Sequence, residues 1–365
     1  MRALVVVALA GCSQWFGLDE PEHTTDARTI DGAPLCLGSG KLEICVDSAP
    51  TMILNLDGTL DTTQDCPLRK DVNGAMVCVL AGSRVTVDTS FTAVGALPIV
   101  VFAVGDISID GTLDVASHGG TVGAGANAAS CPMLPDGTAS TNGGGGGAGG
   151  SFGSLGGHGG AGDMGQTQGA APVGGSFAAN TLHGGCAGGR GGRGGGASLE
   201  GAAGNGGGGV YLLAGGSLMI AGVVNASGGG AGGGSASKGG GGGGGSGGMI
   251  LLHAATIVLG MNGALMANGG GGGGGSDNAA SGNPGGETTE YNKAAPGGFG
   301  GGTTSCAGAT PGCGGDGAIQ GKPAANGGND GTGAGAGAGG GGLGVISVLS
   351  GQSLTGKVSP QPTMM

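Results

Sequence analysis

Aromatic and charged residues are both scarce in this chain. Of its 365 residues, 2% are aromatic and 10% are charged, and lysine and arginine together number only 12. A large conventional core needs bulky apolar side chains, so this composition does not favour one compact globular domain. The formal net charge of -11 argues against nucleic acid as a partner, because phosphate binding needs a basic face.

Helical periodicity and long apolar runs are missing as well. No segment after the N-terminal residues carries the apolar period of a helix, and none is a continuous apolar run long enough to span a membrane. The many Gly-x-Gly-x-x-Gly matches follow from glycine abundance and lie in no strand–helix unit. These absences predict an all-β protein with neither catalytic activity nor a cofactor.

Glycine is the residue that is abundant, at 102 of 365 positions. Glycine loses more conformational entropy on folding than any other residue, so the tracts are disordered unless something holds them. Runs at residues 143–147 and 269–275 break the Gly-X-Y period of collagen. Two outcomes stay open for the tracts, namely disorder or packing as polyglycine-II-like helices with three residues per turn.

A short strand pattern recurs between the glycine tracts. ISIDGTLDV at residues 107–115 matches LNLDGTLDT at residues 54–62, and looser copies follow. Alternating apolar and polar residues indicate half-buried strands, and repetition with a glycine at the bend indicates stacked units. The pattern predicts a right-handed parallel β-helix or solenoid. Its expected interior ladder contains Leu54, Ile107, Leu218 and Ile257.

A second type of strand is apolar on both faces, which is typical of a sheet that is covered on both sides. Such runs occur at residues 77–80, 99–102, 210–213 and 249–252. Three glycine-rich insertions end directly before strands of this type, and they span residues 118–208, 228–247 and 269–342. We therefore expect the insertions to be ordered and to cover the outer face of this sheet.

The N-terminus has the pattern of an export signal. Arg2 is followed by an apolar stretch and by Leu9-Ala10-Gly11-Cys12, which resembles the bacterial lipobox. The resemblance implies a signal peptide at residues 1–11, lipidation of Cys12 and a membrane anchor, and Ser13 after the cysteine favours the outer membrane. Residues 12–33 are polar and acidic and are expected to form a flexible tether to a domain at 34–365.

Cysteine usage supports export. Nine cysteines are present, and eight remain if Cys12 carries lipid. An even number in an exported chain predicts four disulfides, although eight cysteines allow 105 connectivities. Proximity favours the pairs Cys36–Cys45, Cys66–Cys78, Cys131–Cys186 and Cys306–Cys313. A metal site at His183 and Cys186 is the competing interpretation, but no second ligand pair with zinc spacing accompanies them.

The whole chain resembles the uncharacterised glycine-rich, PE-PGRS-like lipoproteins of myxobacteria-type Gram-negative bacteria. The resemblance rests on the lipobox, on VCVLAG at residues 77–82, on GTVGAGANAASC at residues 120–131 and on GGGGGGSGGMILL at residues 240–252. It implies an exported location and this architecture, and it carries no known activity.

Aspartates offer the clearest candidate chemistry. Asp57, Asp88 and Asp110 align at one outward position, and Asp61 with Asp114 at another. A stacked acidic row could act as an acid/base pair or bind calcium, but a solvated polar face explains it more simply.

Three functions therefore compete. The favoured one is a non-catalytic structural or adhesion lipoprotein of the surface, with a polysaccharide or another surface protein as partner. The others are a carbohydrate-active β-helix enzyme and an ice- or surface-binding protein.

Overall fold

The computed structural model describes residues 34–174, 181–195, 199–306 and 312–364. Contacts divide the chain into two units, one made of Met1–Cys36 with Cys45–Ala49 and the other of Leu37–Ile44 with Pro50–Met365. The expected signal peptide, Cys12 and the tether lie outside the described residues.

Short elements open the described chain, and strands dominate after them. Strands β1 (Leu35–Leu37) and β2 (Ile44–Val46) pair as a two-stranded sheet, with the 3-10 helix η1 (Gly40–Leu42) between them. The 3-10 helix η2 (Asp163–Gly165) lies in the first insertion.

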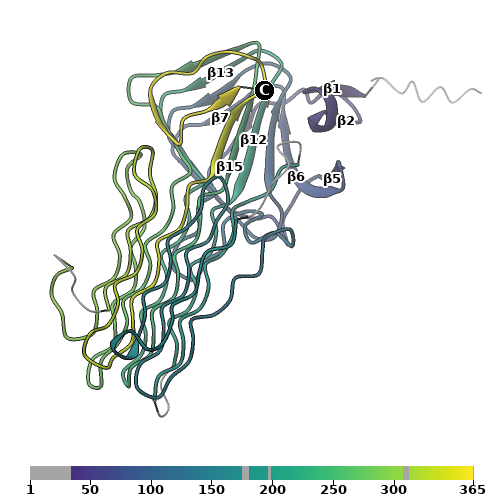
Figure 1. The fold of residues 1–365 in the computed structure, drawn as a ribbon. Helices are drawn as coiled ribbons and strands as arrows, with labels where there is room; N and C mark the ends of the chain where they lie inside the picture. Colours follow the sequence, from purple (N-terminus) through teal and green to yellow (C-terminus); the bar gives the residue numbers. More distant parts are fainter. Residues whose placement is uncertain (1–33, 175–180, 196–198, 307–311, 365) are drawn as a thin grey trace, which may run out of the picture. The chain divides into compact units, whose positions relative to one another are not determined.

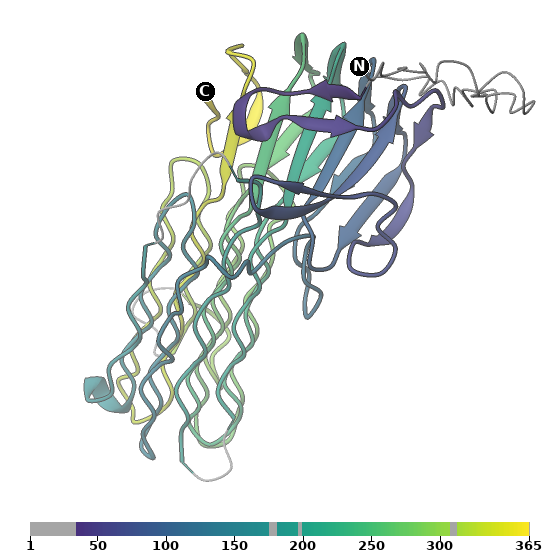
Figure 2. The ribbon, with the colours of Figure 1, turned by 90° about the vertical axis from the view of Figure 1, so that its right-hand side faces the viewer.

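Three larger sheets follow, and successive strands of the chain fall into them in turn (Figures 1 and 2). The five-stranded sheet contains β3 (Leu54–Asn55), β7 (Val85–Val87), β10 (Ile107–Ile109), β13 (Ser217–Ile220) and β16 (Thr256–Leu259). The six-stranded sheet contains β4 (Gly58–Asp61), β8 (Ser90–Val94), β11 (Thr112–Asp114), β14 (Val223–Asn225), β17 (Ala264–Met266) and β19 (Lys357–Ser359). The seven-stranded sheet contains β5 (Arg69–Val72), β6 (Ala75–Gly82), β9 (Ile99–Ala103), β12 (Gly209–Ala214), β15 (Met249–His253), β18 (Val345–Val348) and β20 (Thr363–Met364).

The inward side chains of the five-stranded sheet form one apolar ladder. Parallel pairing places Leu54, Val85, Ile107, Leu218 and Ile257 side by side, which is the expected ladder with Val85 as an additional member. The three central members have no exposed surface, and all five belong to or pack on one hydrophobic core. Alternation along the strands therefore gave the correct buried face.

The expected right-handed β-helix or solenoid is wrong as a description of the fold. The strands form three open sheets, parallel in two cases and mixed in the third, and no closed β-helix is present among the described residues. The mixed sheet arises because β5 returns antiparallel along β6. The repeat predicts which strands stack, but closure depends on the turns between sheets and on the terminal strands, where the pattern ends.

Glycines at the bend between two sheets are required by close backbone contact. A Cβ added to Gly111 would lie 1.6 Å from the carbonyl oxygen of Thr89, and one added to Gly222 would lie 1.8 Å from that of Gly111. Neither residue has a positive φ. The stacking of one bend on the next therefore leaves no room for a side chain.

The glycine-rich insertions pack on one another through backbone hydrogen bonds, and residues 240–247 lie at the centre of this lattice. Successive N–H groups of this segment donate to three different neighbours, and successive carbonyl groups accept from three more. The N–H groups donate to segments 186–192, 336–342 and 229–232. The carbonyl groups accept from segments 147–150, 201–207 and 270–273.

Each neighbour is contacted by every third residue. Gly241 donates to Ala336 and Gly244 to Gly339, at N···O distances of 2.9 and 3.0 Å. A period of three is that of an extended helix with three residues per turn, which has no internal hydrogen bonds and must satisfy its amides elsewhere. Any Cβ on these glycines would meet a neighbouring carbonyl oxygen, at 2.2 Å in the case of Gly244. Glycine is therefore the residue that allows this lattice.

The insertions do not cover the outer face of the seven-stranded sheet, contrary to expectation. They extend beyond the ends of the strands, as Figure 1 shows. The segment Leu37–Ile44 approaches that face instead, since a Cβ on Gly38 would lie 3.1 Å from the hydroxyl of Tyr211. Burial of apolar surface is favourable whichever segment provides the contact, and this segment carries two buried apolar side chains, Leu42 and Ile44.

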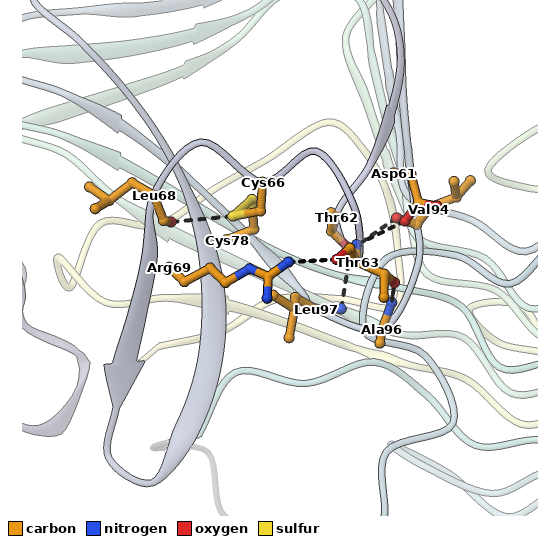
Figure 3. The surroundings of a disulfide bond; sticks show 10 residues. All are labelled: Asp61, Thr62, Thr63, Cys66, Leu68, Arg69, Cys78, Val94, Ala96 and Leu97. Carbon is orange, nitrogen blue, oxygen red and sulfur yellow. Dashed lines mark hydrogen bonds between the residues drawn. A yellow bond between two sulfur atoms is a disulfide. The ribbon is translucent and has the colours of Figure 1, made fainter.

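Four disulfides are present, and they are the pairs that proximity favours: Cys36–Cys45, Cys66–Cys78, Cys131–Cys186 and Cys306–Cys313. Figure 3 shows how the second one holds the loop after β4 against β6, beside hydrogen bonds from Thr62 to Val94 and from Arg69 to Thr63. Multiple disulfides are typical of an exported protein. Among the described residues, no helix has the length and apolarity needed to cross a membrane.

Candidate functional site

The expected acidic rows are only partly formed. Asp61 pairs with Val94, whereas Asp114 pairs with Thr92, so these two aspartates occupy different positions on the six-stranded sheet. The bend between β3 and β4 is shorter than the bends between the later strands of the same two sheets. Asp61 is therefore displaced along its strand relative to Asp114. Asp61 accepts the N–H of Thr63 at 2.8 Å and so stabilises a turn. The arrangement does not form a continuous acidic ladder.

Asp114 belongs to an ionic cluster that ties the third insertion to the strands. The Nε2 of His118 lies 3.0 Å from Asp114, and its Nδ1 lies 2.6 Å from Glu287. Glu287 also accepts the N–H of Gly119 at 2.6 Å. Hydrogen bonds that the ring of His118 donates to Asp114 and Glu287 raise the pKa of His118 to about 10. Because both ring nitrogens are engaged, His118 is a structural tie and has no free nitrogen for general base catalysis.

We expect His118→Gln to destabilise the protein mainly between pH 4.5 and 6.5. The raised pKa of His118 means that its contribution is complete below the unfolded value of 6.5 and is lost as pH rises towards 10. Burial opposes the charge of Glu287, yet the His118 hydrogen bond lowers its pKa below 4.5, so its contribution is lost as pH falls below that value. Partial exposure limits the effect to roughly 1–2 kcal/mol.

Urea unfolding of both proteins across pH 4 to 10 measures this difference. His158→Gln is the matched control, since His158 is exposed and makes its hydrogen bonds to Asn326 and Gly327 through its backbone. A difference between His118→Gln and the unaltered protein that does not change with pH would contradict an ionic tie.

Turns of the third insertion enclose a pocket of about 270 Å³. Four separate stretches of this insertion line it, and most contribute backbone or small side chains. The lining residues are Gly275, Ser276, Asp277, Gly301, Thr303, Gly312, Asp330, Thr332, Ala334 and Gly335. Much of the wall surface is apolar, and the hydroxyls and carboxylates of Ser276, Asp277, Asp330 and Thr332 lie among it.

Two aspartates fix the turns around this pocket. Asp330 is 2% exposed and accepts the N–H groups of Thr332 and Ala334 together with the Thr332 hydroxyl. Asp277 accepts the N–H groups of Ala279 and Ala280 at 2.7 and 2.5 Å. The hydrogen bonds of these carboxylates are turn bonds of the type that Asp commonly makes. These hydrogen bonds fix the conformation of the pocket walls. The backbone hydrogen bonds between the glycine-rich segments hold the chain on either side of the turns.

The residues of the alternative metal site have other partners. Cys186 is bonded to Cys131, and the Nδ1 of His183 lies 2.8 Å from the carbonyl oxygen of Gly184. The ring of His183 also packs edge-on against Phe152, with centroids 5.0 Å apart. Burial lowers the pKa of His183. The geometry therefore assigns His183 to packing within the first insertion.

His253 ends strand β15, where it pairs with Leu213, and Leu213 pairs in turn with Phe102. Its side chain therefore belongs to the face opposite Ala214, and its Nδ1 is buried without a hydrogen-bond partner in the described part of the chain. Burial lowers its pKa accordingly.

Arg190 and Arg193 lie on one edge of their segment, as their spacing predicts. Both contact Glu200, at N···O distances of 3.3 and 2.9 Å. A helix with three residues per turn brings residues three apart to the same side, so one carboxylate can pair with both.

Sequence patterns did not reveal the pocket at the insertion turns. Asp277 and Asp330 lie 53 positions apart in tracts without a shared motif, and only folding of the insertions brings their turns together. The one local signal is Asp-Gly-Thr-Gly at residues 330–333, which is a turn sequence.

Comparison of the chain with protein-family models, with curated proteins and with solved structures finds no match. The insertion-turn pocket is therefore the candidate binding site on its own geometry.

Proposed function

We propose that this protein is a non-catalytic adhesion lipoprotein of the cell surface, anchored by lipid on Cys12 in the outer membrane. The observation that carries the proposal is the glycine lattice, which holds several turns of the third insertion as the walls of one pocket. Binding residues on loops need a rigid scaffold, and backbone hydrogen bonds at every third residue supply one. The partner is a surface polysaccharide or another surface protein, which suits a pocket of hydroxyl, carboxylate and peptide groups.

Export supports this location. Four disulfides need an oxidising compartment, and the N-terminal lipobox resemblance supplies an anchor. The resemblance to glycine-rich lipoproteins agrees with the same location. The enzymatic alternative gains little support, because His118 has both nitrogens occupied and Asp330 is used by a turn.

The test uses cells that produce the full chain, and it measures their retention on glass coated with the extracted surface polysaccharide and surface proteins of the same cells. We expect Cys12→Ser to release the protein from membranes and to abolish retention. Ala334→Tyr should keep the anchor and reduce retention at least tenfold, since the new side chain fills the pocket. Ala279→Tyr is the control, because Ala279 is exposed and does not line the pocket.

Two outcomes would overturn separate parts of the proposal. Retention of Ala334→Tyr cells at the unaltered level would reject the pocket as the adhesive site. A native mature protein that is water-soluble and lacks acyl mass at Cys12 would reject the lipid anchor.

A further inference from the structure

A second pocket lies on the solvent face of the five-stranded sheet and has a different chemistry. Its volume is about 340 Å³, and it spans strands β7, β10 and β13. Strand pairing arranges its outward residues in rows, because Thr86, Ser108 and Met219 stand side by side in register. Two positions before each of them, on the same face, stand Arg84, Asp106 and Ser217, respectively.

The row of Arg84, Asp106 and Ser217 is bound together by hydrogen bonds. The guanidinium of Arg84 lies 3.0 Å from Asp106, which also accepts the N–H and the hydroxyl of Ser217, both at 2.8 Å. The backbone N–H of Ser217, followed by its hydroxyl and by Arg84, lowers the pKa of Asp106. The side chain of Arg84 is 57% exposed, so its remaining N–H donors are open to solvent and fixed in direction.

The opposite side of the pocket carries acceptors. The hydroxyl of Ser108 donates to Asp110 at 2.9 Å, and that of Thr86 donates to Asn55 at 2.9 Å. Each hydroxyl oxygen keeps lone pairs that can accept a further hydrogen bond, and Asp110 has a second carboxylate oxygen that can do the same. Met219 adds an apolar surface beside them, because its side chain is 48% exposed.

From this arrangement we propose that the pocket binds a neutral, hydroxyl-rich saccharide. A pair of sugar hydroxyls can accept from the guanidinium of Arg84 and donate to Asp110, while the C–H groups of the ring lie on Met219. Two carboxylates against one guanidinium give the lining a net negative charge, which disfavours acidic saccharides and phosphorylated ligands. The pocket is separate from the insertion-turn pocket, so the inference does not depend on adhesion through the latter.

Binding of one site is expected to be weak. No aromatic ring lines the pocket, and polar groups that exchange water for sugar hydroxyls gain little net free energy. A dissociation constant of about 1 mM for a single site corresponds to roughly -4 kcal/mol. Many copies anchored on one surface would raise the effective affinity for a long polymer through multivalency.

Titration of the full-length protein with neutral hexasaccharides, followed by NMR, tests the proposal. The probes are cellohexaose, maltohexaose and chitohexaose, with hexagalacturonate as the acidic comparison. We expect at least one neutral probe to bind at millimolar concentration, and Arg84→Gln and Asp110→Asn each to weaken it at least tenfold. Asp88→Asn and Arg190→Gln are matched controls that do not line the pocket, and they should stay within twofold.

Three results would overturn the proposal that this pocket binds a neutral saccharide. Absence of binding by all three neutral probes at about 20 mM, a range that still detects affinities weaker than 1 mM, would overturn the proposal. Stronger binding of hexagalacturonate than of the neutral probes would overturn it as well, as would binding that Arg84→Gln and Asp110→Asn leave unchanged. Circular dichroism and thermal unfolding of each variant ensure that a loss of binding is not a loss of folding. The adhesive pocket stays intact in all of these variants, so failure here leaves the proposed function standing.

Discussion

Alanine in place of Gly244 is expected to destabilise the protein by at least about 3 kcal/mol, which is at the upper end of single substitutions. The added Cβ would lie 2.2 Å from the carbonyl oxygen of Gly270. Neighbours surround the segment on every side through hydrogen bonds, so the backbone cannot move away without breaking several of them. A Gly-to-Ala change also restricts the unfolded chain, but that gain is only about 0.4–1 kcal/mol. Steric overlap therefore decides the sign.

Gly331→Ala is the matched control, because nothing lies within 4 Å of a Cβ at this position and its φ is not positive. Its effect should be between neutral and slightly stabilising. Thermal unfolding compares the stabilities, and amide exchange at residues 240–245 reports the lattice directly. Similar stability of the two variants, or unprotected amides in the unaltered protein, would contradict a packed lattice.

Removal of the Cys131–Cys186 disulfide, by Cys131→Ser with Cys186→Ser, is expected to cost about 4 kcal/mol in the chain-entropy model. The bond closes a sequence separation of 55 residues, and it connects the start of the first insertion to a segment that supports residues 240–247. The unfolded chain gains more freedom when a long loop is opened, so this bond should matter most among those within the insertions.

The bond Cys306–Cys313 supplies the comparison, because it closes a separation of only 7 residues. The same model gives about 2 kcal/mol for a loop of that length. Denaturant unfolding of the two double variants measures the difference. Thiol labelling of the folded protein should also find no free thiol among the eight paired cysteines, and two or more reactive cysteines would contradict the pairing.

Patterns that repeat along the sequence were reliable for strand pairing. The ladder through Leu54, Ile107, Leu218 and Ile257 follows from alternation alone, because side chains of a strand alternate between faces. The four disulfides follow proximity, since cysteines that are near in the chain are easily brought together. The ion pair between Arg84 and Asp106 could also have been predicted, because these residues directly precede the paired Val85 and Ile107.

Register at the turns was not available from the sequence. One shortened bend separates Asp61 from the row of Asp114, and a shift of one residue moves His253 to the opposite face. Such shifts depend on turn geometry, which a loose repeat does not specify, and one residue is enough to exchange the two faces of a strand.

The sequence by itself determined the strand sets, their buried faces, the disulfide pairs and the need for glycine at the bends. Tertiary structure alone decided that the sheets stay open, that Leu37–Ile44 approaches the outer face at Tyr211, and that the insertions pack on one another. The physical reason lies in the range of the interactions. Alternation and spacing are local and can be read along the chain, whereas glycine offers no side chain to identify its partner. The backbone hydrogen bonds of residues 240–247 therefore connect segments whose sequences are nearly alike, and only the three-dimensional arrangement distinguishes them.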